Sequence, residues 1–91
     1  MDVTDAAERQ RYEARIDGEL AGIAEYRSSD ALVTFVHTEV MPEFAGKGVA
    51  SGLVRAALDD VRAHGRRVHA VCPFVKRFVE RHADEYADLL R

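Results

Sequence analysis

The sequence has almost none of the residues that make disulfides, and it lacks the long apolar runs that cross membranes. Only one cysteine, Cys72, occurs among 91 residues, so no intramolecular disulfide can form, and a reducing, cytoplasmic setting is expected. No apolar run approaches the ~20 residues that span a bilayer. The acidic N-terminus has none of the basic and apolar segments of a signal peptide. We therefore expect one soluble domain over residues 10–91, preceded by a flexible lead-in over residues 1–9.

Charge is distributed unevenly along the chain. Residues 1–42 carry four basic and nine acidic side chains, whereas residues 43–82 carry eight basic and four acidic ones. A basic segment attracts anions, so we expect a phosphate-bearing ligand to bind within residues 43–82. These basic residues form no dense cluster and accompany no groove-reading motif, so nucleic acid is not an expected partner.

Apolar residues alternate with polar ones from about Gln10, and they change to helical spacing after Gly48. Residues 31–40 are instead apolar on both faces, which predicts a central strand covered on two sides. In the first alternating segment, Glu13 is expected with Arg11 and Arg15 on the face opposite Tyr12. The expected elements are strands at residues 10–16, 19–26 and 31–40, a helix at 50–64, a strand at 67–72, a helix from 73 and a short helical piece at 84–90. The order β-β-β-α-β-α predicts an α+β fold with a four-stranded, mostly antiparallel sheet, a helix packed on it and a C-terminal helix.

The loop between the third strand and the first helix is the candidate ligand site. In Gly46-Lys47-Gly48, glycines allow backbone N–H groups to approach a ligand closely. The helix that follows adds about half a unit of positive charge at its N-terminus, so a pyrophosphate fits there, with Lys47 and Arg55 as further cations. Two glycines alone are also compatible with a plain turn. A dinucleotide-binding loop is disfavoured because Asp59 and Asp60 come too early for the ribose-binding acid. A Walker loop is excluded because no Gly-Lys-Ser/Thr follows.

Two segments carry a resemblance to a known family. His37-Thr38-Glu39-Val40-Met41-Pro42, followed by Gly46-Lys47-Gly48-Val49-Ala50, resembles the acetyl-CoA signature of the GCN5-related N-acetyltransferases (GNAT). The smallest branch of that family consists of single domains of about this length. It has an H-T-x-V opening, the glycine loop, and a strand ending in Cys with an aromatic residue two positions later, here Cys72-Pro73-Phe74. The resemblance covers roughly residues 12–90. It departs from the family pattern at Glu43 and Ala45, where Gln or Arg is usual.

The resemblance implies an acetyl-CoA-dependent N-acetyltransferase acting on a primary amine of a protein lysine, a polyamine or a small molecule. It also implies a fourth strand that diverges from the third and opens a wedge for the pantetheine arm. The amide of Val40 or Met41 would polarise the thioester carbonyl. The residues implied to bind acetyl-CoA are Val40, Met41, Phe44, Ala45, Gly46, Lys47, Gly48, Val49 and Ala50.

Three side chains are candidates for catalysis. His37 and Glu39 share a face at the strand end, where either can take a proton from the ammonium form of the substrate. A hydrogen-bonded strand histidine and a solvated edge carboxylate fit the pattern equally well. Cys72 precedes a helix whose dipole favours a thiolate, so it is a candidate acetyl carrier, with pocket lining or simple burial as alternatives. No metal site is expected, because His69 and Cys72 would point to opposite faces of a strand.

Two further functions remain open. One is a module that binds CoA without transferring an acetyl group, and the other is an interaction domain that has lost the ligand. Glu43 and Ala45 in the loop favour these two functions. Thr38, the two loop glycines and Cys72, all in their family positions, favour the transferase.

Overall fold

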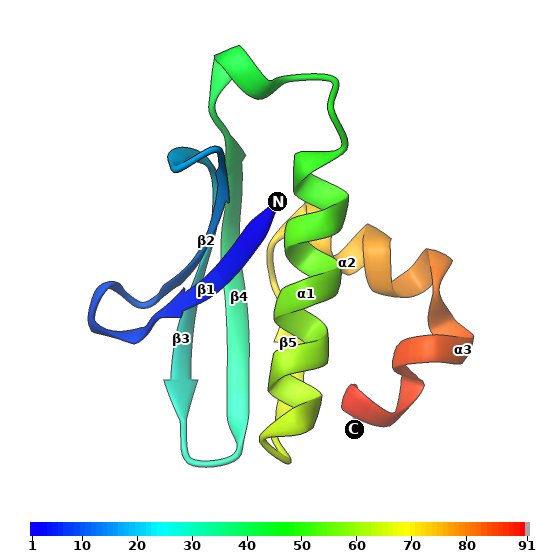
Figure 1. The fold of residues 1–91 in the computed structure, drawn as a ribbon. Helices are drawn as coiled ribbons and strands as arrows, with labels where there is room; N and C mark the ends of the chain where they lie inside the picture. Colours follow the sequence, from blue (N-terminus) through cyan, green and yellow to red (C-terminus); the bar gives the residue numbers. More distant parts are fainter. Residues whose placement is uncertain (91) are drawn as a thin grey trace.

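The computed structural model describes residues 1–90. The elements are β1 (Asp2–Ala6), η1 (Ala7–Arg9), β2 (Arg11–Ile16), β3 (Glu19–Ser29), β4 (Leu32–Val40), η2 (Pro42–Phe44), α1 (Val49–Ala63), β5 (Arg67–Ala70), α2 (Pro73–Arg81), α3 (Ala83–Tyr86) and η3 (Ala87–Leu89). Strands therefore fill most of the first half, and helices most of the second half (Figure 1).

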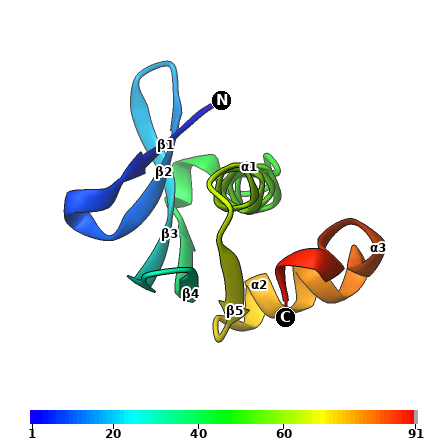
Figure 2. The same ribbon diagram turned by 90° about the horizontal axis from the view of Figure 1, so that it is seen from below.

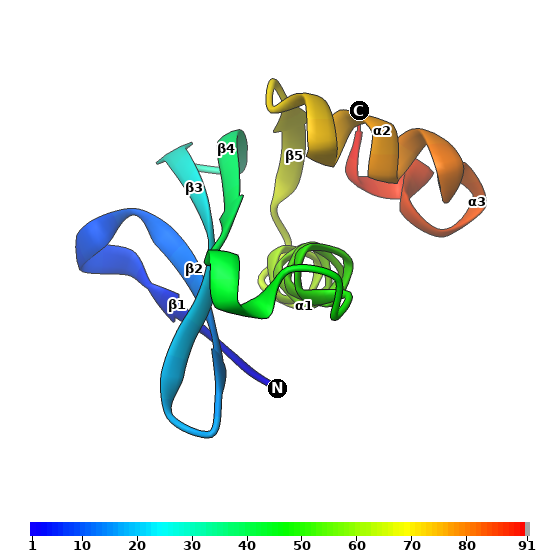
Figure 3. The same ribbon diagram turned by 90° about the horizontal axis from the view of Figure 1, so that it is seen from above.

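Within residues 1–90, the five strands form one sheet in the order β1-β2-β3-β4-β5. The first four pair antiparallel, whereas β5 pairs parallel with β4 after the chain crosses over through α1. Helix α1 lies against one face of the sheet. Helices α2 and α3 lie beside β5, at the end of the sheet away from β1 (Figures 1, 2 and 3). The predicted α+β class and mostly antiparallel sheet are confirmed.

The strand count differs from the prediction, because a fifth strand, β1, forms within residues 1–9, which the sequence predicts to be a flexible lead-in. Strand β1 pairs with β2, with Val3 opposite Ala14, and the Tyr26 hydroxyl donates a hydrogen bond to Asp5 at 2.6 Å. Of its five residues only Ala6 is buried. A strand that buries so little apolar surface is held by backbone pairing, which produces no alternating pattern in the sequence.

The core lies between α1 and the sheet. The apolar side chains of α1 pack against residues of β2, β3 and β4 that include Tyr12, Ala24 and Phe35. The buried residues of the helix are Val49, Leu53, Val54, Ala57, Leu58 and Val61, whereas Ala50 is only partly buried. Gly22 of β3 lets the first turn of α1 come close, because a Cβ there would lie 3.0 Å from the Glu39 carbonyl oxygen and 3.1 Å from Val49 Cγ1. Packing at this point therefore sets the position of the β4–α1 loop.

Candidate functional site

The loop from β4 to α1 leaves the first turn of α1 without a side-chain cap. Gly48 is the N-cap residue with φ 74°, and no side chain of the described chain bonds to the amides of that turn. Gly46 has φ 79°, and a Cβ at either glycine would meet nothing within 4 Å. Glycine is thus required here for backbone conformation, and the space beside the loop is open. Uncapped amides at an open helix N-terminus form a binding site for an anion.

Strand β4 extends beyond its pairing with β5 (Figure 1). The ladder runs only from Leu32, opposite Arg67, to Phe35, opposite Ala70. The Phe35 carbonyl then accepts hydrogen bonds from both Val71 N at 3.0 Å and Cys72 N at 2.9 Å, and the chain turns into α2. Within residues 1–90, no strand pairs with the β5-side edge of residues 36–40. This open edge leads directly to the uncapped turn of α1.

One of the two amides predicted to polarise a carbonyl group faces the open edge. The Met41 amide donates to the Ala21 carbonyl at 2.8 Å, so it points toward β3. Successive residues of a strand present their N–H groups to opposite edges. The Val40 amide therefore points into the open edge, and Met41 contributes no free amide there.

Cys72 and Thr38 come together on the α1 side of β4. The thiol lies 3.4 Å from the Thr38 hydroxyl, although the two residues are 34 positions apart. Cys72 is buried and is the N-cap residue of α2. The thiol therefore lies beside the end of β4 and has a hydrogen-bonding partner.

His37 and Glu39 lie on the other face of β4. His37 Nε2 is 3.3 Å from Glu39 Oε1, and each side chain is 55% exposed. Because Thr38 lies between them in the strand, its side chain points to the opposite face. The three predicted catalytic residues therefore form two groups, with His37 and Glu39 on one face and Cys72 on the other.

The remaining predicted loop residues have distinct environments. Val49 is buried, so it offers the loop only its backbone amide, while Phe44 packs partly against the core. Glu43, Ala45 and Lys47 are exposed. Arg55, expected as a further cation for the ligand, instead donates to Glu85 at 2.8 Å and to the Tyr86 hydroxyl at 3.1 Å, so its charge is used within the protein.

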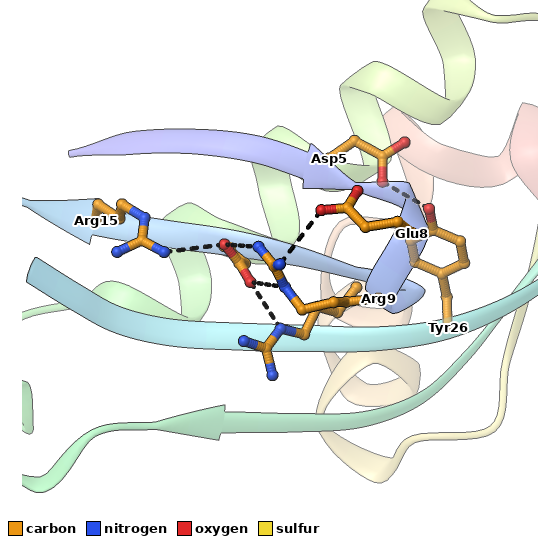
Figure 4. Close-up of polar contacts among 7 residues, drawn as sticks. Asp5, Glu8, Arg9, Arg15 and Tyr26 are labelled. Atoms are coloured by element: carbon orange, nitrogen blue, oxygen red, sulfur yellow. Dashed lines mark hydrogen bonds and ion pairs between the residues drawn. The ribbon is translucent and has the colours of Figure 1, made fainter. Parts of the chain in front are cut away.

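A buried carboxylate was missed by the sequence analysis. Glu13 is only 2% exposed and accepts hydrogen bonds from Arg11 at 2.8 Å, Arg9 at 3.0 Å and Arg15 at 3.1 Å (Figure 4). These bonds, from Arg9 and Arg11 first, hold the pKa of Glu13 at about 2. The alternation of Arg11, Glu13 and Arg15 placed the three on one face, but the contribution of Arg9 depends on the turn η1.

Two further findings concern membrane-spanning helices and metal-binding clusters. None of the helices within residues 1–90 is long and apolar enough to cross a membrane. In the same part of the chain, no three His, Cys, Asp or Glu side chains are placed to hold a metal ion together.

Curated relatives match part of the chain. Protein NATD1 of Bos taurus is 39% identical over 49 residues, which is 54% of this chain and 43% of the bovine protein. Protein NATD1 of Mus musculus is 28% identical over 75 residues, covering 80% of this chain and 68% of the mouse protein. The chain thus spans less than half the length of the bovine relative.

Solved structures match more of the chain. A GCN5-like protein from Staphylococcus aureus has a TM-score of 0.71 at 23% identity, covering 99% of this chain and 87% of that one. A GNAT family acetyltransferase from Brucella melitensis, in complex with acetyl-CoA, has a TM-score of 0.58 at 21% identity, covering 80% of this chain and 55% of that one. These similarities show the fold. The sequence model of the GCN5-related N-acetyl-transferases matches residues 11–89, and the chain therefore belongs to this family.

Proposed function

We propose that the protein is an N-acetyltransferase that takes the acetyl group from acetyl-CoA and gives it to a primary amine. The observation that carries this proposal is the uncapped first turn of α1 at the end of the open edge of β4. The open space at Gly46 and Gly48 and the absence of a capping side chain in the described chain fit a pyrophosphate held by backbone amides. Bound acetyl-CoA would supply an activated acyl group as a thioester.

The protein's own groups have separate roles in this proposal. The amides of Val49 and Ala50, with Lys47, hold the pyrophosphate. The Val40 amide, which faces the open edge, donates a hydrogen bond to the acyl oxygen and stabilises negative charge that develops there.

His37 is the group that we assign to proton removal from the acceptor amine. Its ring is exposed to solvent, from which an acceptor arrives, and Glu39 at 3.3 Å holds the orientation of the ring. Cys72 is buried and bonded to Thr38, and we assign it to lining the wedge. The alternative, that Cys72 carries the acetyl group, predicts a mass gain of one acetyl group.

Binding is tested by isothermal titration calorimetry with acetyl-CoA on the wild type, Gly48→Ala and Gly65→Ala. Gly65, with φ 70°, lies at the other end of α1, so its substitution imposes the same kind of backbone strain away from the loop. We expect Gly48→Ala to weaken binding about ten-fold or more and Gly65→Ala to leave the affinity unchanged. Absence of binding to the wild type would reject the proposal.

Transfer is tested by the release of CoA thiol in the presence of a polyamine, a lysine peptide or a small amine. We expect His37→Gln to lower kcat about 100-fold, while His64→Gln, at the far end of α1, serves as the control. Cys72→Ala should keep measurable activity, and intact protein incubated with acetyl-CoA should gain no acetyl group. Binding without thiol release for every amine would favour the CoA-binding module, which Glu43 and Ala45 in the loop support.

A further inference from the structure

A cavity lies at the end of α1 that is remote from the glycine loop (Figure 1). Its volume is about 210 Å³. This is below the roughly 300–1,000 Å³ of pockets for drug-sized ligands, so the cavity suits a smaller molecule. Its lining comes from β1, β2, β4, the end of α1 and the turn after it. The lining residues include the buried Val33 and Val61 and four polar ones, Asp5, Tyr12, Asp60 and Arg66.

Two carboxylates meet at this cavity. The Tyr26 hydroxyl donates to Asp5 at 2.6 Å (Figure 4), and the Tyr12 hydroxyl donates to Asp60 at 2.8 Å. The two rings pack with centroids 5.4 Å apart. Burial and its own carboxylate partner raise the pKa of each phenol, and the other carboxylate adds to the rise, so both carboxylates lie near both hydroxyls. A phenol donates a hydrogen bond without neutralising the charge, so this pair attracts a cation.

A guanidinium group lines the same cavity without bonding to either carboxylate. Within residues 1–90, the Arg66 side chain has no hydrogen bond and no ion pair. Its charge opposes the rise in the pKa of Tyr26, so it lies on the Asp5 side of the cavity. His64 also lines the cavity, but its Nδ1 lies 2.8 Å from the Asp60 carbonyl oxygen, so the ring is held by its own helix. Opposite charges thus face one cavity without meeting, which suits a ligand that carries both charges.

We propose that this cavity binds a small zwitterion, with its ammonium group between Asp5 and Asp60 and its carboxylate on Arg66. An ammonium group has three N–H donors and no acceptor, so it can bond to both carboxylates. A guanidinium group binds a carboxylate through two parallel N–H···O bonds. A free amino acid of the size of alanine carries both groups. The inference goes beyond the proposed function and does not depend on it, because the cavity shares no residue with the glycine loop.

The test compares L-alanine with ethylamine, which lacks the carboxylate, and with propionate, which lacks the ammonium group. Dissociation constants are measured by NMR titration of the wild type without acetyl-CoA. We expect L-alanine to bind about ten-fold or more tightly than either analogue, since each analogue loses one set of charge-assisted bonds. Ethylamine that binds as tightly as L-alanine would overturn the role of Arg66, and propionate that does so would overturn that of the carboxylates. Absence of L-alanine binding would reject the site.

A single substitution then tests the position of the ligand carboxylate. Arg66→Gln should bind L-alanine and ethylamine equally, with the loss confined to L-alanine. Arg67→Gln is the matched control, because it removes the same charge from the next residue, which does not line the cavity. A preference for L-alanine that survives Arg66→Gln would contradict the inference. Circular dichroism establishes that both variants are folded, and the comparison of the three probes on the wild type needs no variant.

Discussion

Glu13 carries its charge on the face of the sheet opposite Tyr12, because neighbouring residues of a strand point to opposite faces. Helix α1 lies against the Tyr12 face (Figure 1). Arg9, Arg11 and Arg15 surround its carboxylate, and their side chains exclude water from it. A carboxylate with several charge-assisted hydrogen bonds remains ionised at low pH. Removing it would leave three arginines close together without their shared acceptor.

Glu13→Gln should lower the free energy of unfolding by about 2 kcal/mol at pH 7. The pKa of Glu13 is held at about 2, below its ordinary value of 4.5, so its contribution is present above pH 4.5 and is lost as the pH falls toward 2. Urea unfolding at several pH values measures this, and wild type and variant should converge near pH 2. Glu8→Gln, on an exposed residue, is the control. A constant difference across the pH range would contradict the prediction.

Two buried phenols make the fold sensitive to alkali. Tyr12 donates to Asp60 at 2.8 Å and Tyr26 to Asp5 at 2.6 Å, and burial, followed by these bonds, raises the pKa of both phenols above 10. The unfolded chain then loses these protons first, so the free energy of unfolding falls above pH 10. Tyr12→Phe should be about 1 kcal/mol less stable at pH 8. Its stability should fall less steeply between pH 10 and 11, as urea unfolding can measure, and an equal slope would count against this assignment.

At the scale of elements, the contact between α1 and β3 depends on the absence of a side chain. Gly22→Ala would place a Cβ 3.0 Å from the Glu39 carbonyl oxygen, which is backbone and cannot turn away. We expect a loss of about 2 kcal/mol in the free energy of unfolding. Gly52→Ala is the matched control. The new Cβ would meet only the flexible end of the Met1 side chain, and alanine has a higher helix propensity than glycine. Urea unfolding should therefore show a loss for Gly22→Ala and no loss for Gly52→Ala.

The C-terminal elements are joined to α1 by arginines. Arg55 reaches Glu85 and Tyr86, and Arg62 bonds to Asp88 and to the Glu85 carbonyl oxygen. Arg62 also lies over the Tyr86 ring at 5.2 Å. These contacts hold α3 and η3 against α1, and Arg55 also lies over the Phe78 ring of α2 at 5.5 Å.

At the scale of the whole molecule, a small domain depends on every strand that it has. Deletion of residues 1–6 removes β1 and the Asp5 bond to Tyr26. We expect the free energy of unfolding to fall by about 3 kcal/mol, since several hydrogen bonds of about 1 kcal/mol each are lost. A thermal unfolding midpoint measured by circular dichroism tests this. An unchanged midpoint would mean that β1 does not belong to the cooperative unit.

Much of the fold and the location of the candidate site could be predicted from the sequence. Period-two alternation located β2, a segment that is apolar on both faces located β4, and the helical spacing of apolar residues located α1, because these patterns record which side chains leave water. The glycine loop was also predictable, since positive φ at Gly46 and Gly48 favours one residue type. The strand β1 was not, because its pairing depends on backbone groups that every residue carries.

What the sequence determined by itself is local: periodicity, the strand-to-helix loop and the resemblance carried by its motifs. Only the tertiary structure decided which distant groups meet. It placed Cys72 beside Thr38, turned the Met41 amide toward β3, and paired Arg55 with Glu85. The physical reason is that side-chain periodicity reports partition between water and the core. Ion pairs and open strand edges depend instead on which elements, distant in the sequence, the fold places side by side.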